Sequence, residues 1–206
     1  AERCAGQPAA GTAEITGHVR RLPALTLLLL MQSAAAAEVQ QVTVSRDGAR
    51  YHVDMQAQLA VPAARAYAVF SDYRRLPLIN PAVRSATVLG TEADGSTRLA
   101  TELHLCVAFF CRELKQVQDM RRFHEGAALG LSAEVLPQDS DLKFGHARWL
   151  MRPCGNDTCL DFSAELEPDF WVPPLIGSWL IERKLRAQAI TTSAGIERLA
   201  LQPAPP

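Results

Sequence analysis

Hydrophobic and polar residues alternate along much of the chain between residues 38 and 166. Such alternation is typical of β-strands that are buried on one face only. The pattern predicts a first strand pair around the turn Arg46-Asp47-Gly48 and then a series of strands joined by short turns. Because short links join strands that run in opposite directions, we expect an antiparallel sheet. The expected strands are Glu38–Val44, Tyr51–Val61, Val83–Leu89, Thr97–Cys106, Cys111–Arg121, Ala127–Leu136, Leu142–Met151 and Thr158–Leu166.

The alternation also assigns the two faces of the expected sheet. In the last two strands one face carries Gly145, Ala147, Trp149, Met151, Leu160, Phe162, Ala164 and Leu166. The other face carries Phe144, His146, Arg148, Arg152, Asp161, Ser163, Glu165 and Glu167. One face is apolar and the other is mostly polar, which predicts a sheet covered on one side.

Helical spacing is expected in three places. Pro62 precedes a short helix, Ala63–Ser71, and Pro77 and Pro81 limit the next stretch to one further turn. After the two prolines at 173 and 174, a long helix begins near Leu175 and ends near Leu199. We expect one stripe of this helix to cover the sheet: Ile176, Trp179, Leu180, Ala187, Ile190 and Ala194. A second stripe lies nearly opposite: Ile181, Leu185, Ile196 and Leu199.

The beginning of the chain has the features of a secretory signal peptide. Arg20 and Arg21 precede an apolar run that ends at Met31, and four alanines follow, with a suitable cleavage site after Ala37. The alternatives are a buried helix or a membrane anchor, although the run is shorter than the roughly 20 residues that span a bilayer. We therefore expect residues 1–18 to be disordered or a wrongly assigned start, residues 19–37 to be the signal peptide, and the protein to be periplasmic or secreted.

Four cysteines follow the expected cleavage site, in two pairs that each enclose four residues. Both pairs lie where hairpin ends are expected, and zinc sites more often show two residues between ligands. In an oxidising compartment we expect Cys106 to pair with Cys111 and Cys154 with Cys159. Free thiols are the alternative.

Composition and motifs narrow the range of functions. The formal net charge is −1 and the pI is about 6.6, so nothing in the charge favours nucleic acid as a partner. The histidines lack ligand spacing, and neither the H-E-x-x-H nor the G-x-S-x-G motif is present. We expect no metal and no cofactor.

The order of elements, with several short motifs, resembles the START-like, or SRPBCC, superfamily. The motifs are Val61-Pro62-Ala63, Val69-Phe70-Ser71-Asp72-Tyr73, Leu76-Pro77, Asn80-Pro81 and Gly145-His146-Ala147-Arg148-Trp149. The chain is similar to the polyketide cyclase/dehydrase and coenzyme Q-binding branch from about Val42 to Ala200. The resemblance implies an α+β helix-grip (START/Bet v 1-like) domain over residues 38–201, followed by a tail at 202–206. In this fold a curved antiparallel sheet wraps around a long C-terminal helix, with two short helices after the first strands.

The resemblance also implies a deep, mostly apolar cavity between the sheet and the last helix. The residues that we expect to bind a ligand there are Phe70, Tyr73, Leu76, Ile79, Phe109, Phe110, Leu131, Trp149, Phe162, Trp171, Ile176, Trp179, Leu180 and Arg183. Arg183 is either a polar anchor for the ligand or a side chain that extends from the helix edge into water. The apolar hairpin tip at Phe109 and Phe110 either packs beneath the short helices or meets a ligand or membrane.

The expected function is therefore to bind or carry a hydrophobic small molecule, such as a lipid, an isoprenoid or quinone, or a sterol-like compound. An exported monomer without enzymatic activity, in transient contact with a membrane, fits the predicted signal peptide and paired cysteines. The main alternative is a cyclase or dehydratase acting on a polycyclic substrate, with Arg183, Tyr73 or His104 as acid/base groups. A third possibility is a module that binds another protein through an apolar rim.

Overall fold

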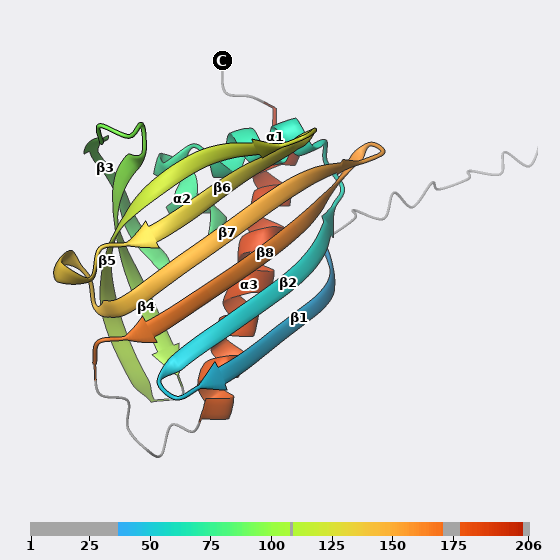
Figure 1. Cartoon of the computed structure of the whole chain (residues 1–206). Helices are drawn as coiled ribbons and strands as arrows, with labels where there is room; N and C mark the ends of the chain where they lie inside the picture. Colours follow the sequence, from blue (N-terminus) through green and yellow to red (C-terminus); the bar gives the residue numbers. More distant parts are fainter. Residues whose placement is uncertain (1–36, 108, 171–177, 204–206) are drawn as a thin grey trace, which may run out of the picture. The chain divides into compact units, whose positions relative to one another are not determined.

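One antiparallel sheet of eight strands forms most of the structure (Figure 1). The computed structural model describes residues 37–107, 109–170 and 178–203, which all lie in the unit Ala34–Pro206. The strands are β1 (Glu38–Asp47), β2 (Arg50–Leu59), β3 (Val83–Thr91), β4 (Thr97–Val107), β5 (Phe110–Glu125), β6 (Ala128–Val135), β7 (Leu142–Cys154) and β8 (Asp157–Pro168). The expected curved antiparallel sheet with a long C-terminal helix is confirmed. The predicted start, the predicted signal peptide up to residue 36, Trp171 and Ile176 lie outside the described residues, as do the last three residues of the predicted tail.

The strand order places the first hairpin, β1–β2, beside the last strand, β8. The order is β1-β2-β8-β7-β6-β5-β4-β3, and every neighbouring pair is antiparallel. Strands β3 to β8 follow one another as a meander, and the first hairpin pairs with β8. Strand β2 therefore lies beside the strand that immediately precedes the last helix in the described chain.

The helices lie on one side of the sheet, and Figure 1 shows α3 behind the strands. The short helices α1 (Ala63–Phe70) and α2 (Leu76–Ile79) lie between β2 and β3 in sequence, with the 3₁₀ turn η1 (Tyr73–Arg75) between them. A second 3₁₀ turn, η2 (Pro137–Asp139), connects β6 to β7. The long helix α3 (Ser178–Leu201) contacts β1, β2, α1 and α2. Among the described helices, none has both the length and the apolar character that a transmembrane span requires.

The alternation of apolar and polar residues places the core on the concave side, as predicted. Met151 and Leu160 are almost completely buried, and they belong to the main core cluster with residues of β2, α1 and α3. Ser163 on the opposite face of β8 is exposed. The turns between strands are tight, and Gly155 in the β7–β8 turn has φ 67°, a conformation that glycine adopts at no steric cost.

The predicted buried face of α3 is wrong. Trp179 is 63% exposed and Ile190 is 41% exposed, whereas Ala189, Ser193 and Ile196 are buried. The stripe that contains Ile196 and Leu199 therefore faces the sheet, and the stripe that contains Trp179 and Ile190 does not. Hydropathy alone misassigns the face because the helix approaches its neighbours through small residues, and size decides this contact more than hydrophobicity.

Two contacts fix the C-terminal part of α3. A Cβ atom built on Gly195 would lie 1.9 Å from the carbonyl oxygen of Ile79 in α2, so only glycine permits this approach. Two residues further along α3, the Glu197 carboxylate accepts a hydrogen bond of 2.6 Å from the backbone N–H of Ala60, and Glu197 is only 3% exposed. The helix is thus held against both α2 and the end of β2.

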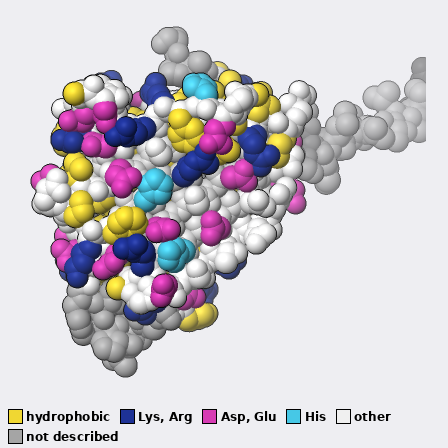
Figure 2. All heavy atoms as spheres, viewed as in Figure 1, with side chains coloured by type: hydrophobic (Ala, Val, Ile, Leu, Met, Phe, Trp, Pro, Cys, Tyr) yellow, Lys and Arg dark blue, Asp and Glu magenta, His cyan; other side chains and the backbone are white. Residues whose placement is uncertain are grey.

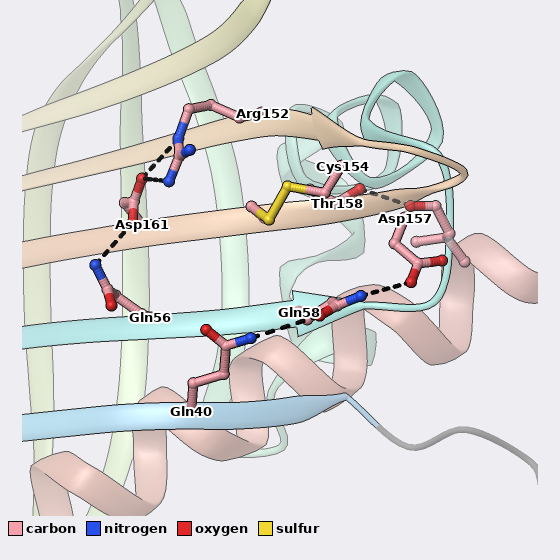
Figure 3. Close-up of a disulfide and its surroundings, with 10 residues drawn as sticks. Gln40, Gln56, Gln58, Arg152, Cys154, Asp157, Thr158 and Asp161 are labelled. Carbon is pink, nitrogen blue, oxygen red and sulfur yellow. Dashed lines mark hydrogen bonds and ion pairs between the residues drawn. A yellow bond between two sulfur atoms is a disulfide. The ribbon is translucent and has the colours of Figure 1, made fainter.

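Both predicted disulfides are present. Cys106 and Cys111 lie directly opposite each other at the end of the β4–β5 hairpin, and Cys154 and Cys159 join β7 to β8. Figure 3 shows the second bridge beside side chains that link four strands across the outer face. There Arg152 pairs with Asp161, which also accepts from Gln56, while Gln58 donates to Asp157 at 2.7 Å.

Gly195→Ala should destabilise the protein strongly. The added methyl group would overlap the backbone of α2, which cannot rotate away as a side chain can, so we expect a loss of about 3 kcal/mol in the free energy of unfolding. Chemical denaturation measures this loss. Gly90→Ala is the matched control because no atom lies within 4 Å of the added group. Equal stability of the two variants would show that α3 does not depend on the close approach.

Replacing Cys154 and Cys159 by serine should lower the free energy of unfolding by about 2 kcal/mol, the value expected for closing a loop this short. Reagents that modify thiols under denaturing, non-reducing conditions should leave the four cysteines of the domain unmodified in the wild type. A variant in which all four are serine should be insensitive to reductant. Full alkylation of the wild type would contradict both bridges.

Candidate functional site

A cavity of about 310 Å³ lies between the concave face of the sheet and α3. Strands β2, β3, β4, β5, β7 and β8 supply the sheet side of the cavity. The short helices α1 and α2 and the turn η1 supply one part of the wall, and α3 supplies the rest. Pockets for small molecules typically have volumes of roughly 300–1,000 Å³. The cavity is therefore large enough for a small organic ligand.

Most of the wall is apolar, and one part of it is aromatic. Trp149 of β7 lies opposite Phe162 of β8 in the sheet, and the two rings stack with centroids 5.2 Å apart and planes inclined by 27°. Phe70 of α1 meets Trp149 at 5.1 Å with the rings tilted by 60°. Because these three side chains come from three elements, the folded sheet and α1 together create this surface.

A polar patch on β4 and β5 interrupts the apolar wall. Gln116 and Gln118 both line the cavity, and Gln116 Nε2 donates to Gln118 Oε1 at 2.7 Å. Thr101 lies opposite Gln116 in the register, and its hydroxyl donates to the Gln116 carbonyl oxygen. Gln118 is only 8% exposed, which is unusual for an uncharged polar side chain in a strand.

A second polar group lies between α2 and α3. Asn80 Nδ2 is 2.9 Å from both Gln188 Oε1 and Thr192 Oγ1, and Asn80 Oδ1 accepts from the backbone N–H of Ala82. The Thr192 hydroxyl in turn donates to the carbonyl oxygen of Gln188. This group uses most of its hydrogen-bonding capacity within the protein, so its role is mainly to join the two helices.

The described lining contains two titratable residues, Tyr73 and Lys115. Burial raises the pKa of Tyr73 above its ordinary value, and the nearby Arg122 guanidinium opposes this shift. The Tyr73 hydroxyl is buried without a hydrogen-bond partner among the described residues, and the neighbouring Arg122 donates to the Ser71 carbonyl oxygen. Tyr73 is therefore protonated at neutral pH. Lys115 is exposed.

Six of the residues predicted to bind a ligand line the cavity: Phe70, Tyr73, Leu76, Ile79, Trp149 and Phe162. Leu131 is fully buried in the core and does not line the cavity. For the six residues that line the cavity, contact with a ligand remains a prediction.

The other predicted residues lie elsewhere or outside the described chain. Phe109 is 80% exposed at the β4–β5 turn, and neither it nor Phe110 lines the cavity. Trp179, Leu180 and Arg183 of α3 do not line it either, and the Arg183 guanidinium lies 5.7 Å from the Trp179 ring. These residues lie away from the cavity because the predicted helix face is wrong. Trp171 and Ile176 are not described.

Apart from Tyr73, the polar residues of the lining were not among those predicted. A usable signal is present in the sequence, however, since the expected Cys106–Cys111 bridge fixes the register of its hairpin. That register places Gln116 opposite Thr101 and Gln118 opposite Leu99. Both glutamines therefore share the inward face of the buried Leu99.

Two other features do not form a comparable site. His104, Cys106 and Cys111 come close together, but both sulfur atoms are joined in the disulfide and are not free thiolates.

A hollow of about 220 Å³ involves polar residues of the outer face, including Asp54, Arg148 and Asp161. Figure 2 shows acidic, basic and histidine side chains interleaved over this face. Arg148 pairs with Glu125 and Asp161 with Arg152, so two of the three charged residues of the hollow already have partners.

Several solved structures share the fold at low sequence identity. A START superfamily protein from Mycobacterium smegmatis has a TM-score of 0.55 and 19% identity, and the match covers 72% of this chain and 98% of that one. A STAR-related lipid transfer protein from Xanthomonas axonopodis has a TM-score of 0.58 and 13% identity, and the match covers 78% of this chain and 99% of that one. The Zhui aromatase/cyclase from Streptomyces sp. R1128 has a TM-score of 0.56 and 15% identity, and the match covers 73% of this chain and 93% of that one. At such identities the likeness establishes the fold alone.

No curated protein matches the sequence. A family model described as polyketide cyclase / dehydrase and lipid transport matches residues 59–190. This range extends from the end of β2 into α3 and includes the strands, short helices and helix residues that enclose most of the cavity. The chain belongs to the polyketide cyclase / dehydrase and lipid transport family, within the START-like superfamily.

Proposed function

We propose that this protein is an exported START-like protein that binds or carries a hydrophobic small molecule in the cavity between the sheet and α3. The observation that carries the proposal is the cavity itself, with its aromatic wall of Phe70, Trp149 and Phe162. An apolar ligand gains about 25 cal/mol for each Å² of apolar surface that it removes from water. The ligand class is a lipid, an isoprenoid or quinone, or a sterol-like compound.

Export rests on two separate features. The sequence up to Ala37 has the order of a secretory signal peptide. The bridges Cys106–Cys111 and Cys154–Cys159 are of the kind that persists in oxidising compartments. A periplasmic or secreted location is consistent with both.

We further propose that the protein is a monomer in transient contact with a membrane, and the exposed aromatic residues support the membrane contact. Phe109 at the β4–β5 turn and Trp179 in the first turn of α3 are both largely exposed. Figure 1 shows this turn and the start of the described part of α3 at the lower end of the view. Exposed aromatic side chains of this kind occur where proteins meet membranes or partners.

A cyclase or dehydratase acting on a polycyclic substrate is the second candidate function. Tyr73 favours it, because a protonated hydroxyl in the cavity wall is a possible general acid. The distinguishing measurement is to extract the bound compound, incubate it with fresh protein and recover it. Unchanged compound supports binding or transport, whereas conversion supports an enzyme.

Ala164→Phe should remove ligand binding by filling the cavity. Ala164 lines the cavity on β8, and a phenyl ring there would occupy the volume that the ligand needs. Native mass spectrometry of protein purified from its own envelope should show a bound small molecule in the wild type. The variant should carry none, or bind the extracted compound at least about tenfold more weakly.

Ser163→Phe is the matched control, because Ser163 is the neighbouring residue on the exposed face of the same strand. It adds a similar ring without entering the cavity, and it should retain the ligand. Repeated recovery of empty wild-type protein, together with no binding of fluorescent lipids, would contradict the proposed function.

A further inference from the structure

We infer that the cavity selects an uncharged ligand that carries a hydrogen-bonding group, such as a carbonyl oxygen, and that Gln118 binds this group. The inference rests on the proposed function and specifies the chemistry of the ligand. It follows from the polar patch on β5, where two glutamines face the interior of an otherwise mostly apolar cavity.

The sheet register forces both glutamines inward. Gln116 and Gln118 lie opposite Thr101 and Leu99, and all four side chains occupy the same face of the hairpin. Leu99 is fully buried and Thr101 nearly so. Rotation of a strand side chain to the other face would require a shift of one residue in register, which the Cys106–Cys111 bridge prevents.

The hydrogen bonds within the patch are incomplete. One bond joins the two amides, from Gln116 Nε2 to Gln118 Oε1. Among the described residues, no acceptor meets the Gln118 amide N–H groups and no donor meets Gln116 Oε1. If the oxygen and nitrogen atoms of both amides exchange places, the pair still retains a free donor and a free acceptor.

Incomplete bonding has a consequence for the ligand. Water can satisfy these amides in an empty cavity, and a ligand that displaces the water must replace its hydrogen bonds or lose affinity. A pure hydrocarbon cannot do so. A carbonyl oxygen can accept from the Gln118 N–H groups, and a hydroxyl can use the free acceptor as well.

The charge of the lining disfavours a buried carboxylate on the ligand. Lys115 is the only charged residue in the described lining, and it is exposed. The Asp141 carboxylate accepts from the backbone N–H of Lys115 at 2.7 Å, so a negative charge already occupies this part of the rim. A ligand carboxylate inside the cavity would lose its hydration without gaining a cationic partner.

Three planar probes of similar size separate these cases: naphthalene, 2-acetylnaphthalene and 2-naphthoate. Their dissociation constants are measured by calorimetry with the full-length wild type and with Gln118→Met, which keeps the side-chain length and removes the amide. We expect Gln118→Met to bind 2-acetylnaphthalene about tenfold more weakly than the wild type does. Naphthalene should bind the variant at least as tightly as the wild type, and 2-naphthoate should bind the wild type more weakly than 2-acetylnaphthalene does.

Gln56→Met is the matched control, because Gln56 is exposed on the outer face of β2. It should leave all three constants unchanged, and thermal unfolding checks that each variant is folded. Gln116→Met is the second variant and should weaken the preference for 2-acetylnaphthalene in the same direction. Equal binding of 2-acetylnaphthalene by the wild type and folded Gln118→Met, or tightest binding of 2-naphthoate, would overturn the inference while leaving the proposed function intact. Failure of all three probes to bind the wild type contradicts the proposed function, and the inference with it.

Discussion

The approach of α3 to α2 at Gly195 is the contact on which the rest of the domain depends. It brings the helix within van der Waals distance of the Ile79 backbone, and Glu197 holds the same region to Ala60. Burial follows this anchoring, since Ile196 and Ala200 are buried whereas Trp179 and Arg183 are exposed. One helix anchored mainly at one end cannot fill the whole concave side of an eight-stranded sheet, and the unfilled space is the cavity.

An unfilled cavity has an energetic cost that the rest of the structure must offset. Side chains around a void lose dispersion contacts, and a ligand restores them. The wall of the cavity is closely packed: Leu160 is almost completely buried, and Trp149 packs between Phe70 and Phe162. The exposed ion pairs of the outer face contribute little by comparison, because exposed pairs are usually worth less than about 1 kcal/mol.

The sheet could be predicted from sequence because its signal is local and periodic. Leu160, Phe162 and Ala164 alternate with Asp161 and Ser163, and each strand carries its own evidence of which face is buried. The helix face could not be predicted in this way. Gly195 and Ser193 are buried because of what lies opposite them in α2 and β2, which hydropathy along α3 does not contain. Gln118 is an intermediate case, since its inward direction follows from the register of the hairpin and requires no knowledge of the other elements.

Family membership alone leaves the choice between a carrier and an enzyme open, because the family's description and its structural neighbours include both cyclases and lipid transfer proteins. The chemistry of the described lining favours binding. Tyr73, which its raised pKa keeps protonated, is a candidate acid for a cyclisation or dehydration, but the described lining holds no carboxylate or histidine to act as the base, and Lys115 lies exposed. The most distinctive groups of the cavity are instead the amides of Gln116 and Gln118, which do not titrate. Amides can orient and select a ligand through hydrogen bonds but cannot act as its acid or base, so the polar part of this cavity is better suited to recognition than to catalysis.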